Sequence, residues 1–188
     1  TGISDAEIAA QKQAEALYNY YAHHDQTITT LSEAKHHPQF VDFICCCITQ
    51  WFHIDSVYHF RHLVGSLFAW FIIVLAGSFL MNLFHWRTAF FGAIFLFISP
   101  HFIGQSFGNL VDIPFAFFYL LTLYHTYVLL CEFPIIKWKR LLLITLSIIA
   151  ATYIHSGGYV LLHYLYLFTI LIFLVRNPIK KIFTKQYV

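Results

Sequence analysis

One carboxylate stands out in this sequence because of its position. Asp112 lies in residues 108–114 (GNLVDIP), at the start of a long apolar run. A carboxylate at the edge of hydrocarbon is costly, so Asp112 is expected to face a polar cavity, a metal ion or a cationic ligand. An Asp before Ile-Pro is also ordinary chemistry for capping a helix N-terminus. The two roles are compatible, and the sequence leaves both open.

Two further carboxylates, Asp5 and Glu7, lie near the start of the chain. Either could act as a general base or bind a divalent cation. The alternative is a solvated helix N-terminus, where acidic side chains are favoured by the helix dipole. Ser4 and Glu7 have the spacing of a capping box, which predicts a helix over residues 5–21.

The 12 histidines and four cysteines raise the question of a metal or haem site. His125 and His163 lie within apolar runs and could ligate haem from facing helices. The histidine doublets at 23–24 and 36–37 do not repeat the boxes of a di-iron oxygenase, so roles as interfacial or helix-to-helix hydrogen bonders are favoured and haem is not. Three cysteines are consecutive (45–47) and no C-x-x-C occurs, so neither a zinc site nor a disulfide framework is indicated.

The composition indicates which elements must position these side chains. Of the 188 residues, 59% are hydrophobic and only 11% are charged, and the mean hydropathy is +0.66. A soluble domain of this size could not bury so much apolar surface. The 11 Lys and Arg residues form no basic patch, so nucleic acid is not an expected partner. The sequence therefore predicts an integral membrane protein surrounded by membrane lipids.

Uncharged apolar runs predict an all-α membrane fold with five spans, at about residues 63–84, 88–103, 113–131, 139–155 and 158–175. The second run ends at the break Ser99-Pro100, and residues 104–112 are interpreted as a connection. Gly157-Gly158 predicts a turn between the last two spans. Residues 1–60 form no span. In that segment 23–37 is expected to loop, and 38–52 to be a short apolar helix, interrupted by Asp42 and Gln50, that lies in the interface. Residues 61–188 are the transmembrane domain.

Basic residues predict the orientation. They gather at 87, at 137–140 and from 176 onward, whereas the connections near 104–112 and 155–158 carry none. By the positive-inside rule the basic connections and the C-terminus, with Lys180, Lys181 and Lys185, are cytoplasmic. Residues 1–60, which hold seven of the nine acidic residues, are therefore expected to be exoplasmic, meaning periplasmic or luminal.

Residues 99–116 (SPHFIGQSFGNLVDIPFA) resemble a stretch of bacterial polytopic glycosyltransferases of the C-type superfamily, the dolichyl-phosphate-mannose and aminoarabinose transferase-like proteins. The family version reads roughly SPRFFGHSF followed by N-x-KDIPFA. Three further segments are similar and occur in the expected order: residues 37–42 (HPQFVD), 61–68 (RHLVGSLF) and 155–158 (HSGG, where the family has R-x-GG).

The resemblance implies a membrane enzyme that transfers a sugar, with inversion, from a polyprenyl-phosphate donor to an exoplasmic acceptor. It implies a catalytic base early in the first exoplasmic segment, a position that Asp5 matches. It also implies a substrate-binding site, for which the candidates are Glu7, His101, Gln105, Asn109, Asp112 and His155. The first span of the family would precede Thr1, so the chain is interpreted as a truncated or degenerate member.

Four departures from the family pattern bear on activity. Where the family has Arg, His, Lys and Arg, this chain has His101, Gln105, Val111 and His155. The exoplasmic helix ends are therefore expected to lack a permanent cation for the departing phosphate. Either a divalent cation held by Asp5, Glu7 or Asp112 replaces these charges, or the chain is a non-catalytic subunit that has other membrane proteins as partners. A haem- or metal-dependent redox subunit is the third alternative.

Overall fold

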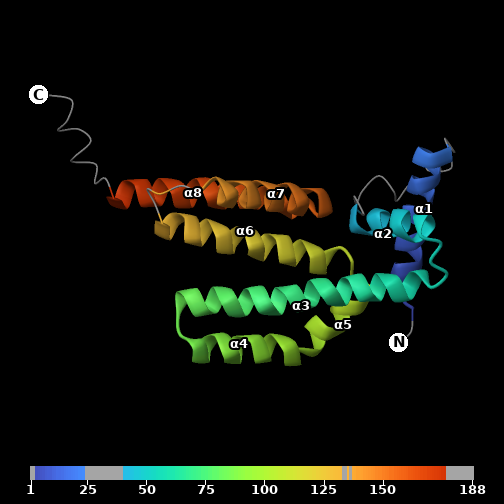
Figure 1. The fold of residues 1–188 in the computed structure, drawn as a ribbon, viewed down its shortest axis with the longest axis horizontal. Coiled ribbons are helices and arrows are strands. Elements are labelled where there is room, and N and C mark those ends of the chain that lie inside the picture. Colours follow the sequence, from blue (N-terminus) through green and yellow to red (C-terminus); the bar gives the residue numbers. More distant parts are fainter. Residues whose placement is uncertain (1–2, 24–39, 133–134, 136, 177–188) are drawn as a thin grey trace, which may run out of the picture.

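A computed structural model describes residues 3–23, 40–132, 135 and 137–176, and every regular element within these ranges is a helix (Figure 1). The predicted all-α class is therefore confirmed for the described part of the chain. The elements in chain order are α1 (Asp5–His23), α2 (Phe40–Trp51), α3 (Val57–Leu83), α4 (Trp86–Ile98), α5 (Pro100–Gly108), α6 (Asp112–Glu132), α7 (Trp138–Ile154), the 3-10 turn η3 (Ser156–Gly158) and α8 (Tyr159–Arg176).

The helix α1 begins at the predicted capping box. The backbone N–H of Ser4 donates to Glu7 Oε2 at 2.8 Å, and the backbone N–H of Glu7 donates back to Ser4 Oγ at 3.3 Å. These two bonds satisfy amide groups that the first turn of a helix leaves without partners. The predicted helix is thus confirmed, and it continues to His23.

The predicted short apolar helix over residues 38–52 is confirmed as α2, but neither Asp42 nor Gln50 interrupts it. Asp42 lies in the first turn of one continuous helix and is buried. Burial is tolerated here because the carboxylate pairs with Arg61 of α3. The predicted loop 23–37 falls almost entirely outside the described residues.

The helices α3 and α6 are each long and apolar enough to cross a membrane. At 1.5 Å per residue, the 27 residues of α3 extend over about 40 Å, more than the roughly 30 Å of a bilayer core. The helix starts at Val57, earlier than the predicted span at 63. Its extra turns carry Arg61 and His62, which bind side chains of the N-terminal segment.

The predicted second span, 88–103, is not one straight helix. It divides into α4 and α5, whose axes differ by 63°. Ser99 lies between the two helices and its Oγ accepts the backbone N–H of Phe102 at 3.4 Å, while Pro100 occupies the first position of α5, where its missing N–H costs nothing. Residues 104–108 are consequently helical and not the predicted connection.

The predicted turn at Gly157-Gly158 is confirmed as η3, between α7 and α8. A Cβ at Gly158 would lie 2.5 Å from the backbone nitrogen of Thr152, so only glycine fits this close approach. Among the described residues, two helices are long and apolar enough to cross a membrane, or three if the bent pair α4–α5 counts as one span. The basic tail at Lys180, Lys181 and Lys185 lies outside the described residues.

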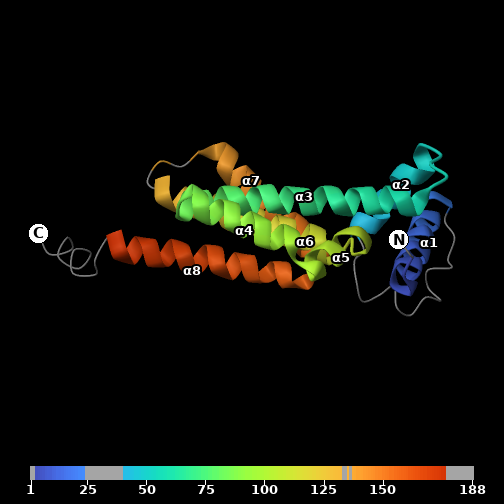
Figure 2. The ribbon, with the colours of Figure 1, turned by 90° about the horizontal axis from the view of Figure 1, so that it is seen from below.

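The helices α3 and α6 form the centre of the bundle, with α4 and α5 against α3, and α7 and α8 against α6 (Figure 1). Ala69 and Ile72 of α3 meet Ile113 of α6 in one apolar cluster. The helices α1 and α2 lie at one end of the bundle, and Figure 2 shows α1 crossing that end at a steep angle to α3. The C-terminal end of α8 lies at the opposite end.

Candidate functional site

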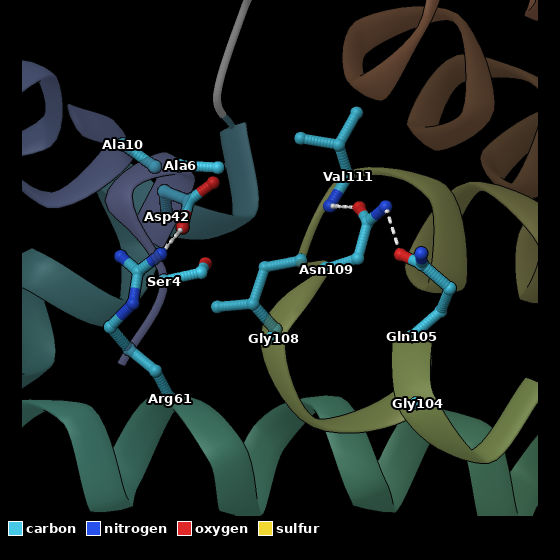
Figure 3. Close-up of a pocket in the computed structure, with 11 residues that line it drawn as sticks. Ser4, Ala6, Ala10, Asp42, Arg61, Gly104, Gln105, Gly108, Asn109 and Val111 are labelled. Atoms are coloured by element: carbon cyan, nitrogen blue, oxygen red, sulfur yellow. Dashed lines mark hydrogen bonds and ion pairs between the residues drawn. The ribbon is translucent and has the colours of Figure 1, made fainter. Parts of the chain in front are cut away.

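The end of the bundle that carries α1 and α2 contains a polar cavity of about 520 Å³, within the usual size range of small-molecule sites. Its walls come from four helices and the connection before α6 (Figure 3). The lining residues are Ser4, Ala6, Ala10, Asp42, Arg61, Gly104, Gln105, Gly108, Asn109, Leu110 and Val111. Of the predicted site residues, Gln105 and Asn109 are therefore in the cavity wall.

The cavity contains a permanent cation, which corrects the expectation from the sequence. The Arg61 guanidinium pairs with Asp42 at 2.5 Å, and both side chains are only 2% exposed. Arg61 Nη1 also donates to Gln11 Oε1 at 3.0 Å. Its Nε has no hydrogen-bond partner among the described residues. A buried N–H without a partner is costly, so this part of the guanidinium lacks a compensating interaction.

Burial and the Arg61 guanidinium act in opposite directions on the Asp42 carboxyl. Burial raises the pKa of Asp42, and the adjacent guanidinium opposes that rise through its charge and hydrogen bond. Removing one partner of a buried ion pair strongly destabilises a protein, because the other charge stays buried without compensation. The pair therefore fixes α2 against α3 beside the cavity.

A second polar contact lies behind the cavity wall. Glu7 is 5% exposed, and its Oε1 is 2.7 Å from Nε2 of His62 on α3. Burial raises the pKa of Glu7, but the hydrogen bonds from Ser4 and His62 outweigh it and leave that pKa below its ordinary value. A Cβ added at Gly108 would lie 3.1 Å from Glu7 Oε1. Glu7 thus touches three elements at once, α1, α3 and α5.

The connection before α6 is organised by Asn109. Its Oδ1 accepts the backbone N–H groups of Val111 and Asp112 at 3.1 and 2.8 Å. Its Nδ2 lies 2.8 Å from both Gln105 Oε1 and Asp112 Oδ2. The two backbone N–H groups at the start of α6 are therefore capped by Asn109, and Asp112, for which capping was one of two open roles, contributes only its contact with Asn109 Nδ2. Asp112 itself is exposed and outside the cavity lining.

The other predicted residues lie around this site. Asp5 is exposed in the first turn of α1, between the lining residues Ser4 and Ala6. His101 is exposed in the first turn of α5. His155 accepts the backbone N–H of Gly157 at its Nδ1, at 3.0 Å, and packs on Phe115. His155 therefore stabilises the η3 turn.

The carboxylates proposed for a divalent cation do not converge. Within the described residues, no three His, Cys, Asp or Glu side chains are grouped closely enough to hold a metal ion. Glu7 is instead engaged by His62 and Ser4.

The prediction missed the residues that organise this site: Gln11, Asp42, Arg61 and His62. One signal in the sequence pointed to them. Asp42 is an acid within an apolar segment, and Arg61 is the last cation before 25 residues without a formal charge. Opposite charges within apolar segments are expected to form an ion pair, because an unpaired charge is rarely buried.

The arrangement places a guanidinium, two side-chain amides and a hydroxyl around a cavity of small-molecule size at the end of an apolar bundle. No family model matches this chain, and neither the curated proteins nor the solved structures give a match.

Proposed function

We propose that this protein is a membrane glycosyltransferase-like protein whose cavity binds the headgroup of a polyprenyl-phosphate sugar. The observation that carries the proposal is Arg61, a buried cation in the cavity wall with an unpartnered Nε. Guanidinium groups are well suited to phosphate oxygens. Gln105 adds an amide group of the kind that holds sugar hydroxyls, beside Asn109 and Ser4, whose side chains are hydrogen-bonded within the chain.

The proposed reaction is an inverting displacement at the anomeric carbon. The acceptor hydroxyl transfers its proton to a carboxylate as its oxygen bonds to the anomeric carbon. The bond from that carbon to the phosphate oxygen breaks, and polyprenyl phosphate leaves with the electron pair. Arg61 stabilises this departing anion. Asp5 is the proposed base: it is solvent-exposed on α1, beside two residues of the cavity wall.

We propose five spans, formed by α3, the bent pair α4–α5, α6, α7 and α8, with the cavity on the exoplasmic side. The distribution of basic residues supports this orientation. Labelling of single cysteines at Lys12 and Lys139 with an impermeant reagent, in a variant without the native cysteines, tests it. Labelling of the position 12 cysteine alone in sealed, right-side-out vesicles is expected. Labelling of only the position 139 cysteine would refute it.

The function is tested with the purified chain in lipid nanodiscs. A polyprenyl-phosphate sugar is expected to bind, and Gln105→Leu is expected to weaken binding about tenfold, as the loss of a buried hydrogen bond implies. The matched control is Gln50→Leu, an exposed glutamine at the end of α2. Asp5→Ala is expected to keep binding and lose transfer. Equal binding by wild type and Gln105→Leu would remove the cavity from the proposal.

A second candidate is a non-catalytic subunit of a larger membrane complex. The observation that favours it is the internal pairing of the charges near the cavity: Arg61 with Asp42, and Glu7 with His62. Such a site is stable without a ligand. Native mass spectrometry of the gently solubilised protein separates the two functions. Bound polyprenyl phosphate supports the transferase, and stoichiometric protein partners without that lipid support the subunit.

A further inference from the structure

The helix α1 forms one wall of the cavity through Ser4, Ala6 and Ala10. Its later part packs on α2, where Tyr21 meets Phe43 with ring centroids 6.1 Å apart. Its earlier part is held to α3 differently, by polar side chains. The two attachments of α1 therefore rest on different chemistry.

The polar attachment consists of two contacts, which join one face of α1 to two consecutive residues of α3. Glu7 and Gln11 are four residues apart, so they project from the same face of α1. They meet two consecutive residues of α3: Glu7 contacts His62 at 2.7 Å, and Gln11 accepts from Arg61 at 3.0 Å. We define these four residues as the clasp.

Three of the four clasp residues are shielded from water, and the fourth, His62, is 15% exposed. Glu7 and Gln11 are each 5% exposed, and Arg61 is 2% exposed. Hydrogen bonds to charged groups in such surroundings are strong, and they require close geometry. Glu7 also occupies the space next to Gly108, a residue of the cavity wall, so the early half of α1 lies against α5 as well as α3.

We propose that the clasp is a closing device, in which Glu7–His62 and Gln11–Arg61 hold the early half of α1 against α3 and thereby control access to the cavity. When the clasp is broken, the early half of α1 separates from α3 while its later half stays on α2. Glu7 and His62 are positioning residues in this device. The inference concerns the cavity wall, and it holds for either proposed function.

The test measures access directly. Ala10→Cys places a thiol on the half-buried cavity side of α1 with little change in volume. The rate of its reaction with a maleimide is followed by peptide mass spectrometry on the full chain in nanodiscs. The native thiols Cys45 and Cys46 are buried, and burial raises the pKa of each, to about 12 and about 11, so they react slowly.

In the Ala10→Cys background, His62→Ala removes one clasp contact without touching the capping box. It is expected to raise the labelling rate about tenfold. Glu7→Ala is expected to do the same, and the double variant is expected to add little to either single variant because both remove one contact. Glu7→Gln, whose amide still reaches His62, is expected to restore most of the protection.

Two matched controls separate the clasp from fraying of α1. Lys12→Ala changes an exposed side chain on the same helix, and Ser4→Ala breaks the cap but leaves the contact with His62. Both are expected to leave labelling within about twofold of the parent. The inference is overturned if His62→Ala leaves the rate unchanged, or if Lys12→Ala raises it as much as His62→Ala does.

Discussion

The two ends of the bundle hold their charges in different ways. At the cavity end, Arg61 pairs with Asp42 from another helix, and both are shielded from water. At the opposite end, Glu132 meets Lys137 and Arg140, its near neighbours in sequence, and Lys137 is 59% exposed. Buried pairs are strongly destabilising to break, whereas exposed pairs contribute little. The cavity end is thus built by tertiary contacts that the chain forms only when folded.

The sharpest test of this difference is Arg61→Met. It leaves the Asp42 carboxyl buried without its partner, and it is expected to lower the free energy of unfolding by about 3–5 kcal/mol. Denaturant titration in detergent micelles measures the change. Arg61→Met combined with Asp42→Leu is expected to recover most of the loss, because no charge then remains buried. A loss below about 1 kcal/mol in the single variant would show that the two ends are energetically alike.

Two glycines of α3 show that packing is also tighter at the cavity end of this helix than around Gly77. A Cβ at Gly65, near the cavity, would lie 2.5 Å from the backbone oxygen of Ser106, whereas a Cβ at Gly77 would find only Ala93 at 3.9 Å. Gly65→Ala is expected to cost about 1–3 kcal/mol by overpacking. Gly77→Ala is expected to be neutral or to stabilise by up to about 1 kcal/mol. Equal thermal unfolding midpoints for the two variants would contradict this contrast.

Acid should act on the cavity end through Glu7. Folding lowers the pKa of this carboxyl, so its ionised form stabilises the fold above pH 4.5, the ordinary value for Glu, and that contribution is lost as the pH falls through the lowered pKa. Glu7→Gln is expected to be less stable than wild type by about 1.5 kcal/mol near pH 7. The gap should close in acid. A gap that is independent of pH, measured by thermal unfolding, would exclude the ionised carboxylate as its source.

The smallest effect is expected at the opposite end. Glu132→Ala removes one exposed pair, with Lys137, and one half-buried pair, with Arg140. It is expected to change stability by less than Arg61→Met does, by about 1 kcal/mol, and by less in high salt. Unfolding at two salt concentrations measures this. A larger loss than that of Glu7→Gln would reverse the ranking of the two ends.

The features that the sequence predicted correctly are those that depend on residues close together in the chain. The capping box of Ser4 and Glu7 and the turn at Gly157-Gly158 depend on neighbours in the chain, and they were predicted. The pairing of Asp42 with Arg61 joins two helices, and no local pattern encodes it. The continuation of the chain as α5 had a local signal, Ser99 followed by Pro100, which was interpreted only as an end and is also a helix start.

For the candidate site, Gln105 and Asn109 were predicted and do line the cavity. They lie four residues apart in one short segment, so the sequence spacing alone predicts that they are close in space. The cation was missed because Arg61 was interpreted as the boundary of a span. An apolar run ends where charges begin, but α3 continues through that boundary because its first turns are covered by α1 and α2.

The bend at Ser99 has a mechanical consequence. The 13 residues of α4 extend over only about 20 Å, and the chain then turns by 63° into α5. In a bilayer this side of the protein is shorter than the surrounding hydrocarbon layer, while α3 beside it is longer. Lipids next to α4 would have to thin to match it, at a cost of fractions of a kcal/mol per Å of mismatch. The bend therefore gives the two sides of the bundle different apolar lengths, so bilayers of different thickness would fit one side better than the other.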